Sequence, residues 1–489
     1  MASGSGERDG LGHSLRYPAF RNLFASSTAS SLGAAISLVS VSWIVYHYTG
    51  SALDIAYLGL TGIAPAIALG LFAGVVADRY NRRSLMVTAD LSRMIGMALL
   101  TAFLFLVGFS LPLILGIMIL VNSFSALFTP ASQAMIPSLV PKPSLEDANG
   151  LLSSTASVTS SIGSATGGIL VVLVGSVWGL GINALTYALS AIFLIQIASD
   201  LGRSAQSASR ARTTFRRDFS EGMGYVLHDR TLVEVSFGYL PSNFLSAFVA
   251  PFFVVYAATR FGGNAAVYGY LVAALAAGVA VGSLIVGRVR ARPHAGVLMG
   301  ICLLIEGCSW TTLALSTNLG ISLLAPIAAG LAIGFANTLY YSTIQAVVPG
   351  HVLGRVLSIG DFGSFAAIPT GLVVGGLLIA RYGVGPAFLT AGIGVLITAT
   401  TLLLLPDFRR FGRERGSPSV SAPIDPPPAR RGTRAPEDLT ANSAGRDEGG
   451  ATPCLVRLSH MYSRGQLKST AVPSRDSHLL EDSWSTHVE

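Results

Sequence analysis

Residues 271–286 read Leu-Val-Ala-Ala-Leu-Ala-Ala-Gly-Val-Ala-Val-Gly-Ser-Leu-Ile-Val, an apolar run without a charged residue. A helix that spans a bilayer needs about 20 mostly apolar residues, and runs of this kind recur through the first 406 residues with short gaps between them. The runs are continuous, whereas strands of a transmembrane barrel alternate apolar and polar residues over segments of about ten. The sequence therefore predicts an all-α membrane protein and excludes a β-barrel.

The charge distribution agrees with this reading. Charged residues make up 12% of the 489 residues, against about 25% in soluble domains. The first 406 residues carry 20 basic and 14 acidic residues, so the net charge of +7 comes mainly from the membrane-embedded part. A basic excess there sets orientation in the bilayer, and we expect no nucleic-acid partner. The three cysteines predict neither a disulfide framework nor a metal site.

Apolar windows predict twelve membrane-spanning helices in two groups of six. The first group covers 22–46, 54–77, 84–107, 111–131, 148–174 and 177–199. The second group covers 232–258, 266–287, 295–316, 320–345, 355–380 and 384–405. The predicted domains are an N-terminal segment (1–19), an N-terminal six-helix bundle (20–199), a linker (200–231), a C-terminal six-helix bundle (232–406) and a tail (407–489). The polar, Pro-rich tail cannot bury a core, so we expect it to be disordered.

The basic residues of the first 406 positions predict the orientation. With twelve spans, 17 of the 20 fall on the side that holds both termini. Arg260 and Arg381 fall on the opposite side, and Arg93 lies inside a span. Short cytoplasmic loops carry the excess of Lys and Arg. We therefore expect both termini, the linker and the tail to be cytoplasmic, in a multi-pass protein of the plasma (inner) membrane.

Two short patterns recur in the second half and indicate an internal duplication. Gln133-Ala134-Met135-Ile136-Pro137 returns as Gln345-Ala346-Val347-Val348-Pro349, shifted by 212 positions. Gly167-Gly168-Ile169-Leu170 returns as Gly375-Gly376-Leu377-Leu378, shifted by 208. The matches keep their order, and transporter folds are commonly built from repeated halves.

The most specific motif lies between the second and third predicted spans. It reads Gly74-Val75-Val76-Ala77-Asp78-Arg79-Tyr80-Asn81-Arg82-Arg83. This resembles the loop signature of the major facilitator superfamily: a Gly, three residues, an acid, a base, a turn and two bases. Asn81 replaces the usual turn glycine, and Asn tolerates a left-handed backbone better than most residues.

The resemblance implies two helical bundles that rock about a central site, with this loop latching them on the cytoplasmic side. Asp78 would lie against the positive N-terminal end of the span that begins near Gly354 and Arg355. The loop arginines would pair with nearby acids. The expected gating residues are Gly74, Asp78, Arg79, Arg82, Arg83, Asp90 and Arg93. The matching loop of the second half has basic residues but no acid, which predicts an asymmetric gate.

Within the superfamily the chain is similar to exporters of the third drug:proton antiporter group, which includes multidrug, macrolide and siderophore exporters. The similarity rests on Phe20-Arg21-Asn22-Leu23-Phe24, Trp43-Ile44-Val45-Tyr46, Thr49-Gly50-Ser51-Ala52 and Ala148-Asn149-Gly150-Leu151. It implies export driven by the proton gradient.

Three acids fall clearly inside predicted spans: Asp90, Glu306 and Asp361. An ionised carboxylate at the bilayer centre costs about 2.5–3.5 kcal/mol or more, so each should be protonated, paired or facing water. Glu306 lies nearest mid-membrane without a basic residue one turn away, and Asp361 lies about two turns from a span end. Both are candidates for proton coupling. Glu306 could instead hold a hydrogen bond within its bundle, and Asp361 could belong to the gate.

The superfamily fold implies a cavity lined mainly by the first, fourth, seventh and tenth spans. Their candidate ligand contacts are Trp43, Asn122, Asn243, Phe244, Asn337 and Tyr340. Aromatics and neutral amides suit a largely apolar ligand with a few hydrogen-bonding groups. Alternatively, the amides bridge helices and the aromatics only pack.

Together these features predict a secondary transporter that exports an amphipathic small molecule, such as a drug, natural product or siderophore-like compound, by proton-coupled alternating access. We expect a monomer without cofactor or metal, powered by the proton gradient. The sequence holds no Walker loop, His-Glu-x-x-His or Cys-x-x-Cys, so we expect no enzyme. Two alternatives stay open: a lipid or lysophospholipid transporter of the same fold, and a non-transporting receptor or scaffold whose tail binds a partner.

Overall fold

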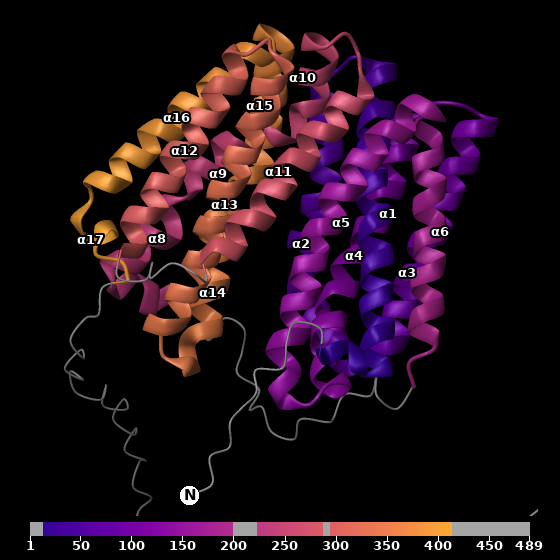
Figure 1. Cartoon of the computed structure of the whole chain (residues 1–489), viewed down its shortest axis with the longest axis horizontal. Helices are drawn as coiled ribbons and strands as arrows, with labels where there is room; N and C mark the ends of the chain where they lie inside the picture. Colours follow the sequence, from indigo (N-terminus) through magenta and orange to yellow (C-terminus); the bar gives the residue numbers. More distant parts are fainter. Residues whose placement is uncertain (1–12, 199–222, 287–293, 413–489) are drawn as a thin grey trace, which may run out of the picture. The chain divides into compact units, whose positions relative to one another are not determined.

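The computed structural model describes residues 13–198, 223–286 and 294–412, and they are helical almost throughout, without a strand in these ranges. Figure 1 follows the helices from indigo to yellow along the chain. The helices of the first half are α1 (Pro18–Thr49), α2 (Ala52–Arg79), α3 (Arg82–Leu106), α4 (Leu111–Leu139), α5 (Leu145–Leu173) and α6 (Ser176–Ile195). Two 3₁₀ turns, η1 (His13–Arg16) and η2 (Lys142–Ser144), precede α1 and α5.

The second half contains shorter helical pieces. They are α8 (Arg230–Gly238), α9 (Leu240–Ser246), η3 (Ala250–Phe252), α10 (Phe253–Arg260), α11 (Ala265–Val286), α12 (Ala295–Leu315), α13 (Leu319–Val347), α14 (Gly350–Phe365), α15 (Ile368–Tyr382), α16 (Val384–Leu404) and α17 (Pro406–Arg409). Among the described residues, eleven helical stretches are long and apolar enough to cross a membrane, and the shorter α15 is apolar as well. The predicted all-α membrane protein is confirmed, and α14 with α15 forms the stretch predicted as the eleventh span.

Two of the spans in the second half are broken. The seventh consists of α8, α9, η3 and α10, with Pro241 and Pro251 at the starts of α9 and η3. The eleventh breaks at Ala366 and Ala367, just before Pro369. Proline lacks the amide donor of a continuing helix. The two broken spans pack against each other through α8, α9, α14 and α15. Discontinuous helices in transporters commonly surround the binding site.

The predicted span boundaries agree with the helices except at a few ends. α4 continues to Leu139 instead of 131, although Pro130 and Pro137 lie within it. Positions 407–412 were predicted as tail, but Phe408 is fully buried and Gly296 donates its amide to the carbonyl of Phe411 at 3.3 Å. The predicted segments 1–12, 199–222 and 413–489 lie outside the described residues.

The repeated glycine pairs make equivalent contacts in the two halves. A Cβ on Gly167 of α5 would lie 3.0 Å from the carbonyl oxygen of Ile36 in α1, and a Cβ on Gly375 of α15 would lie 3.0 Å from the Cα of Phe248, just after α9. The first glycine of each pair thus packs within its own half of the chain. This equivalence supports the predicted duplication.

The second glycine of each pair contacts the other half. A Cβ on Gly168 would lie 2.9 Å from the Cα of Gly269 in α11, and one on Gly376 would lie 3.1 Å from the Cβ of Ala56 in α2. α5 therefore packs against α11, and α15 packs against α2. These two helix pairs join the first six helices to the second group.

We predict that Gly168→Ala lowers the melting temperature of the purified protein, because the new methyl group meets backbone atoms that cannot move away independently. The control is Gly116→Ala in α4, where a Cβ meets nothing within 4 Å. Alanine in place of a helical glycine stabilises by roughly 0.5–1 kcal/mol when space allows. Thermal unfolding followed by intrinsic fluorescence should therefore separate the two variants, and equal shifts would contradict the close approach.

Candidate transport site and gate

The loop that carries the motif is short and ends in a helix cap. α2 ends at Arg79 and α3 begins at Arg82, and Asn81 accepts a hydrogen bond from the backbone amide of Ser84 at 3.1 Å. Its φ is −63°. Asn81 therefore does not use the left-handed backbone that Asn tolerates, and it serves instead as the N-cap of α3, a role that Asn fills well.

The two arginines at the start of α3 bind carbonyl groups of their own bundle. Arg82 donates to the carbonyl of Ala134 in α4 at 2.7 Å. Arg83 donates to the carbonyls of Leu194 and Ile195 at 3.0 and 2.6 Å, at the C-terminal end of α6. A cation is stabilised at this end of a helix. These contacts fix the loop on the first bundle. Gly74, Asp78 and Arg79 lie in the last turns of α2, where side chains fall outside the described residues.

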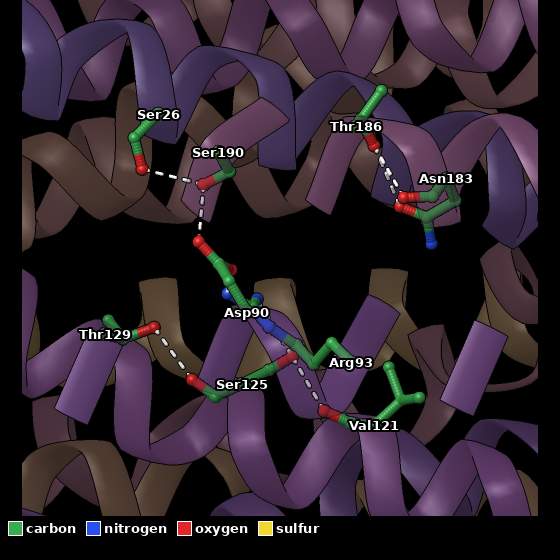
Figure 2. A network of polar contacts seen from close by, with 9 residues as sticks. All are labelled: Ser26, Asp90, Arg93, Val121, Ser125, Thr129, Asn183, Thr186 and Ser190. Atoms are coloured by element: carbon green, nitrogen blue, oxygen red, sulfur yellow. Dashed lines mark hydrogen bonds and ion pairs between the residues drawn. The ribbon is translucent and has the colours of Figure 1, made fainter. Parts of the chain in front are cut away.

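Asp90 and Arg93 lie inside the first bundle and form an ion pair with each other (Figure 2). Asp90 is 0% exposed and Arg93 4%. Ser190 of α6 donates to Asp90 at 2.6 Å, and its hydroxyl lies 2.7 Å from that of Ser26 in α1. The pair therefore connects α3 to α6 and, through Ser190, to α1.

The guanidinium of Arg93 is held on two sides by aromatic rings. It lies 4.5 Å from the centroids of both Phe128 and Tyr187, a separation typical of cation–π contacts. Arg93 also makes a long hydrogen bond, 3.4 Å, to Ser125. It borders a cavity of about 420 Å³, which we call the hydroxyl cavity.

Glu306 and Asp361, the two candidates for proton coupling, line one cavity of about 150 Å³ in the second half, which we call the carboxylate cavity. Glu306 of α12 is 7% exposed and accepts hydrogen bonds from Ser246 at 2.6 Å and from the indole of Trp310 at 3.2 Å. Asp361 of α14 accepts one from Tyr341 at 2.7 Å. The hydrogen bond anticipated for Glu306 within its bundle is thus present, and it does not remove Glu306 from the cavity wall.

Three of the six expected ligand contacts also line the carboxylate cavity: Asn243 of α9, and Asn337 and Tyr340 of α13. No Lys, Arg or His occurs among the described residues that line it. Sequence reasoning described the ligand contacts as uncharged, whereas the structure places them beside two carboxylates.

The remaining expected contacts lie elsewhere. Asn122 lines a cavity of about 650 Å³, here called the central chamber, whose walls come from all six helices of the first half and from η3, α10, α11 and α15 of the second. Trp43 is half-buried and packs against the apolar core. Phe244 packs against the ring of Phe248, with 5.1 Å between centroids. Neither aromatic residue borders one of these three described cavities.

Several residues of these sites were missed by sequence reasoning. Ser246, Trp310 and Tyr341 bind the two carboxylates, and Ser190 binds Asp90. Trp310 follows Glu306 by four positions, a spacing that places two side chains on one helix face and could have indicated the contact. The other partners lie on different helices or 20 positions away, and no local pattern marks them.

Comparison with known proteins agrees with this architecture. The model of the transmembrane secretion effector family matches residues 13–424. Macrolide efflux protein A of Streptococcus pyogenes is 24% identical over 404 residues, which is 80% of this chain and 97% of that protein. The multidrug efflux pump Tap of Mycobacterium tuberculosis is 25% identical over 413 residues, 82% of this chain and 96% of that protein.

Among solved structures, a bacterial homologue of the human lysosomal transporter Spinster superimposes with a TM-score of 0.62. The match covers 82% of this chain and 99% of that one, at 16% identity, and concerns the fold alone. Since the family model spans most of the chain and the fold matches, this chain belongs to the transmembrane secretion effector family of the major facilitator superfamily, and it is a membrane transporter, not an enzyme.

Proposed function

We propose that this chain exports an amphipathic small molecule across the plasma membrane by proton-coupled alternating access, as a monomer with both termini in the cytoplasm. The names of its relatives, which include a macrolide efflux protein and a multidrug efflux pump, support the direction and the substrate class. The proton gradient is the energy source, and no cofactor takes part.

The observation that carries the proposal is the meeting of Glu306 and Asp361 at one cavity. A carboxylate among apolar helices is costly unless it is protonated, paired or hydrated. Both accept hydrogen bonds from neutral donors, and the described cavity wall offers no cation to either. Binding and release of a proton is therefore the change of charge at these carboxylates that costs least free energy during a transport cycle.

One titrating group is sufficient for export. One elementary charge that crosses about 100 mV gains roughly 2.3 kcal/mol, and this energy sustains a concentration ratio of about 50-fold for a neutral substrate. Two carboxylates at one cavity offer two positions at which this proton can bind.

We predict that Glu306→Gln and Asp361→Asn together abolish efflux driven by a pH gradient, because neither amide exchanges a proton. The measurement is efflux of a fluorescent amphipathic dye from proteoliposomes, with and without an imposed gradient. Downhill movement of the dye along its own gradient should persist, since the chamber is unchanged.

The matched control is Glu146→Gln, which removes an exposed acid in the first turn of α5. This variant should retain gradient-driven efflux. Full efflux by the double variant would exclude both carboxylates as the coupling groups.

A second prediction concerns the gate. Asp78→Asn should slow turnover by about tenfold or more while the affinity for the dye changes little, because the loop latches the bundles and does not contact the substrate. Steady-state efflux rates and equilibrium dye binding, measured on the same preparation, test this. A matching loss of affinity would place Asp78 in the binding site instead.

A third prediction concerns orientation. The basic residues gather on the side of the termini, which is the cytoplasmic side by the positive-inside rule. Epitope tags at residues 1 and 489 should both resist antibody in intact spheroplasts and bind it after permeabilisation. Labelling of either tag in intact cells would reverse or break the predicted topology.

A further inference from the structure

The hydroxyl cavity is lined mainly by polar side chains. Eleven of its eighteen lining residues are Ser, Thr, Asn or Gln, and α1, α3, α4, α5 and α6 all contribute. Several polar side chains that line it make no hydrogen bond within the described part of the chain: Ser30 and Ser31 of α1, and Ser132 and Gln133 of α4. By contrast, Ser125 donates to the carbonyl of Val121 in its own helix.

Arg93 adds a buried donor to the same wall. Its side chain is 5% exposed, and its Nε finds no partner in the described structure. A buried donor without an acceptor is energetically unfavourable, and more so when it is charged. The lining hydroxyls and the side-chain amide of Gln133 can therefore bond to a hydrogen-bonding guest or to water that fills the cavity, whereas the Nε of Arg93 lies buried behind the wall.

The charges around the cavity select the kind of guest. Arg93 is its one charged lining residue in the described structure, and the fully buried Asp90 neutralises it. An anionic group would approach Asp90, and an ammonium group would approach Arg93. A neutral group rich in hydroxyls is repelled by neither charge. It can also donate hydrogen bonds to the surrounding side chains and accept hydrogen bonds from them.

The hydroxyl cavity adjoins the central chamber. Both are lined by Ser31, Ala34, Ala156 and Tyr187. Most other residues of the chamber wall are apolar, among them Leu58, Met97 and Val272. The two spaces together therefore present an apolar region joined to a polar one.

We propose that the transported molecule places a neutral, polyhydroxylated head group, such as a glycosyl group, in the hydroxyl cavity and its apolar body in the central chamber. This inference rests on the proposed function and names its substrate class. Arg93, Ser132 and Gln133 bind the head group, and Asp90 is a positioning residue that holds Arg93 and keeps the site neutral.

The test measures binding of tritiated octyl β-D-glucoside, below its micellar concentration, to the full chain in lipid nanodiscs, with empty nanodiscs subtracted. Octanol, octanoate and octylammonium compete as unlabelled probes with the same chain. We expect saturable binding of the glucoside. Each of the three competitors should bind with an affinity at least about tenfold lower than that of unlabelled glucoside, because each lacks the hydrogen bonds of the sugar head group.

Ser132→Ala with Gln133→Ala should weaken glucoside binding by about tenfold and leave the affinity for octanol within about twofold. The matched control is Ser123→Ala, a half-buried serine of the same helix that lines none of the three cavities and whose hydroxyl bonds to the carbonyl of Ile119. It should change neither affinity. Melting temperatures of all variants confirm that they are folded.

Three results would overturn the inference. The first is the absence of saturable glucoside binding, which would make the cavity a water-filled vestibule only. The others are stronger competition by octanoate or octylammonium than by glucoside, and a loss of glucoside affinity in Ser123→Ala equal to that in the double variant. Dye efflux is measured on the same preparations. If efflux fails while the head-group preference holds, the proposed function fails and the binding assignment stands. If efflux succeeds without the preference, the assignment alone is wrong.

Discussion

The close approach of backbones between the two halves is the constraint on which the rest of this structure depends. Lipid tails are as apolar as leucine, so membrane helices gain little from apolar contact and associate where small residues allow tight packing. α5 meets α11 where Gly168 faces Gly269, and α15 meets α2 where Gly376 faces Ala56. Larger side chains at these positions would separate the halves and widen every space that both of them line.

The two halves handle their buried polar groups in different ways. In the first, Asp90 and Arg93 neutralise each other, and several hydroxyls of the cavity that Arg93 borders make no hydrogen bond in the described structure. In the second, Glu306 and Asp361 accept hydrogen bonds from Ser246, Trp310 and Tyr341, without a cation among the described residues of their cavity. Under the functions proposed here, the first half recognises the substrate while the second exchanges the proton. A duplicated fold has thus acquired unlike chemistry in equivalent bundles.

Much of the fold follows from the sequence because hydropathy is a property of long segments. The predicted helix ends agree closely because a charge, a glycine or a proline marks most of them. Pro241, Pro251 and Pro369 lie at the breaks of the two broken spans. These prolines alone did not predict the breaks, because a proline indicates a functional break only when the span is also known to line a site.

The candidate sites could be predicted only in part. Which face of a helix meets a cavity depends on its rotation, and each residue turns a helix by about 100°. Asn243, Asn337 and Tyr340 do line a cavity, whereas Trp43 and Phe244 pack against other side chains. The motif indicated that Asn81 can replace a turn glycine, but its role as the N-cap that accepts from the amide of Ser84 depends on where α3 begins. Contacts between distant helices, such as Ser190 with Asp90, leave no local trace.

The position of the carboxylates relative to the breaks explains how a proton could act on the contact between the halves. Asp361 lies on α14, and beyond the break at 366–367 the same span continues as α15, which carries Gly376 against α2. Glu306 accepts its bond from Ser246 at the end of α9, two residues before Phe248, against which Gly375 packs. A change of charge at either carboxylate alters hydrogen bonds that hold a helix end, and a broken helix can shift one segment without unwinding the other. Under the proposed proton coupling, both changes would reach α15, one of the two helices of the second half that pack closely against the first.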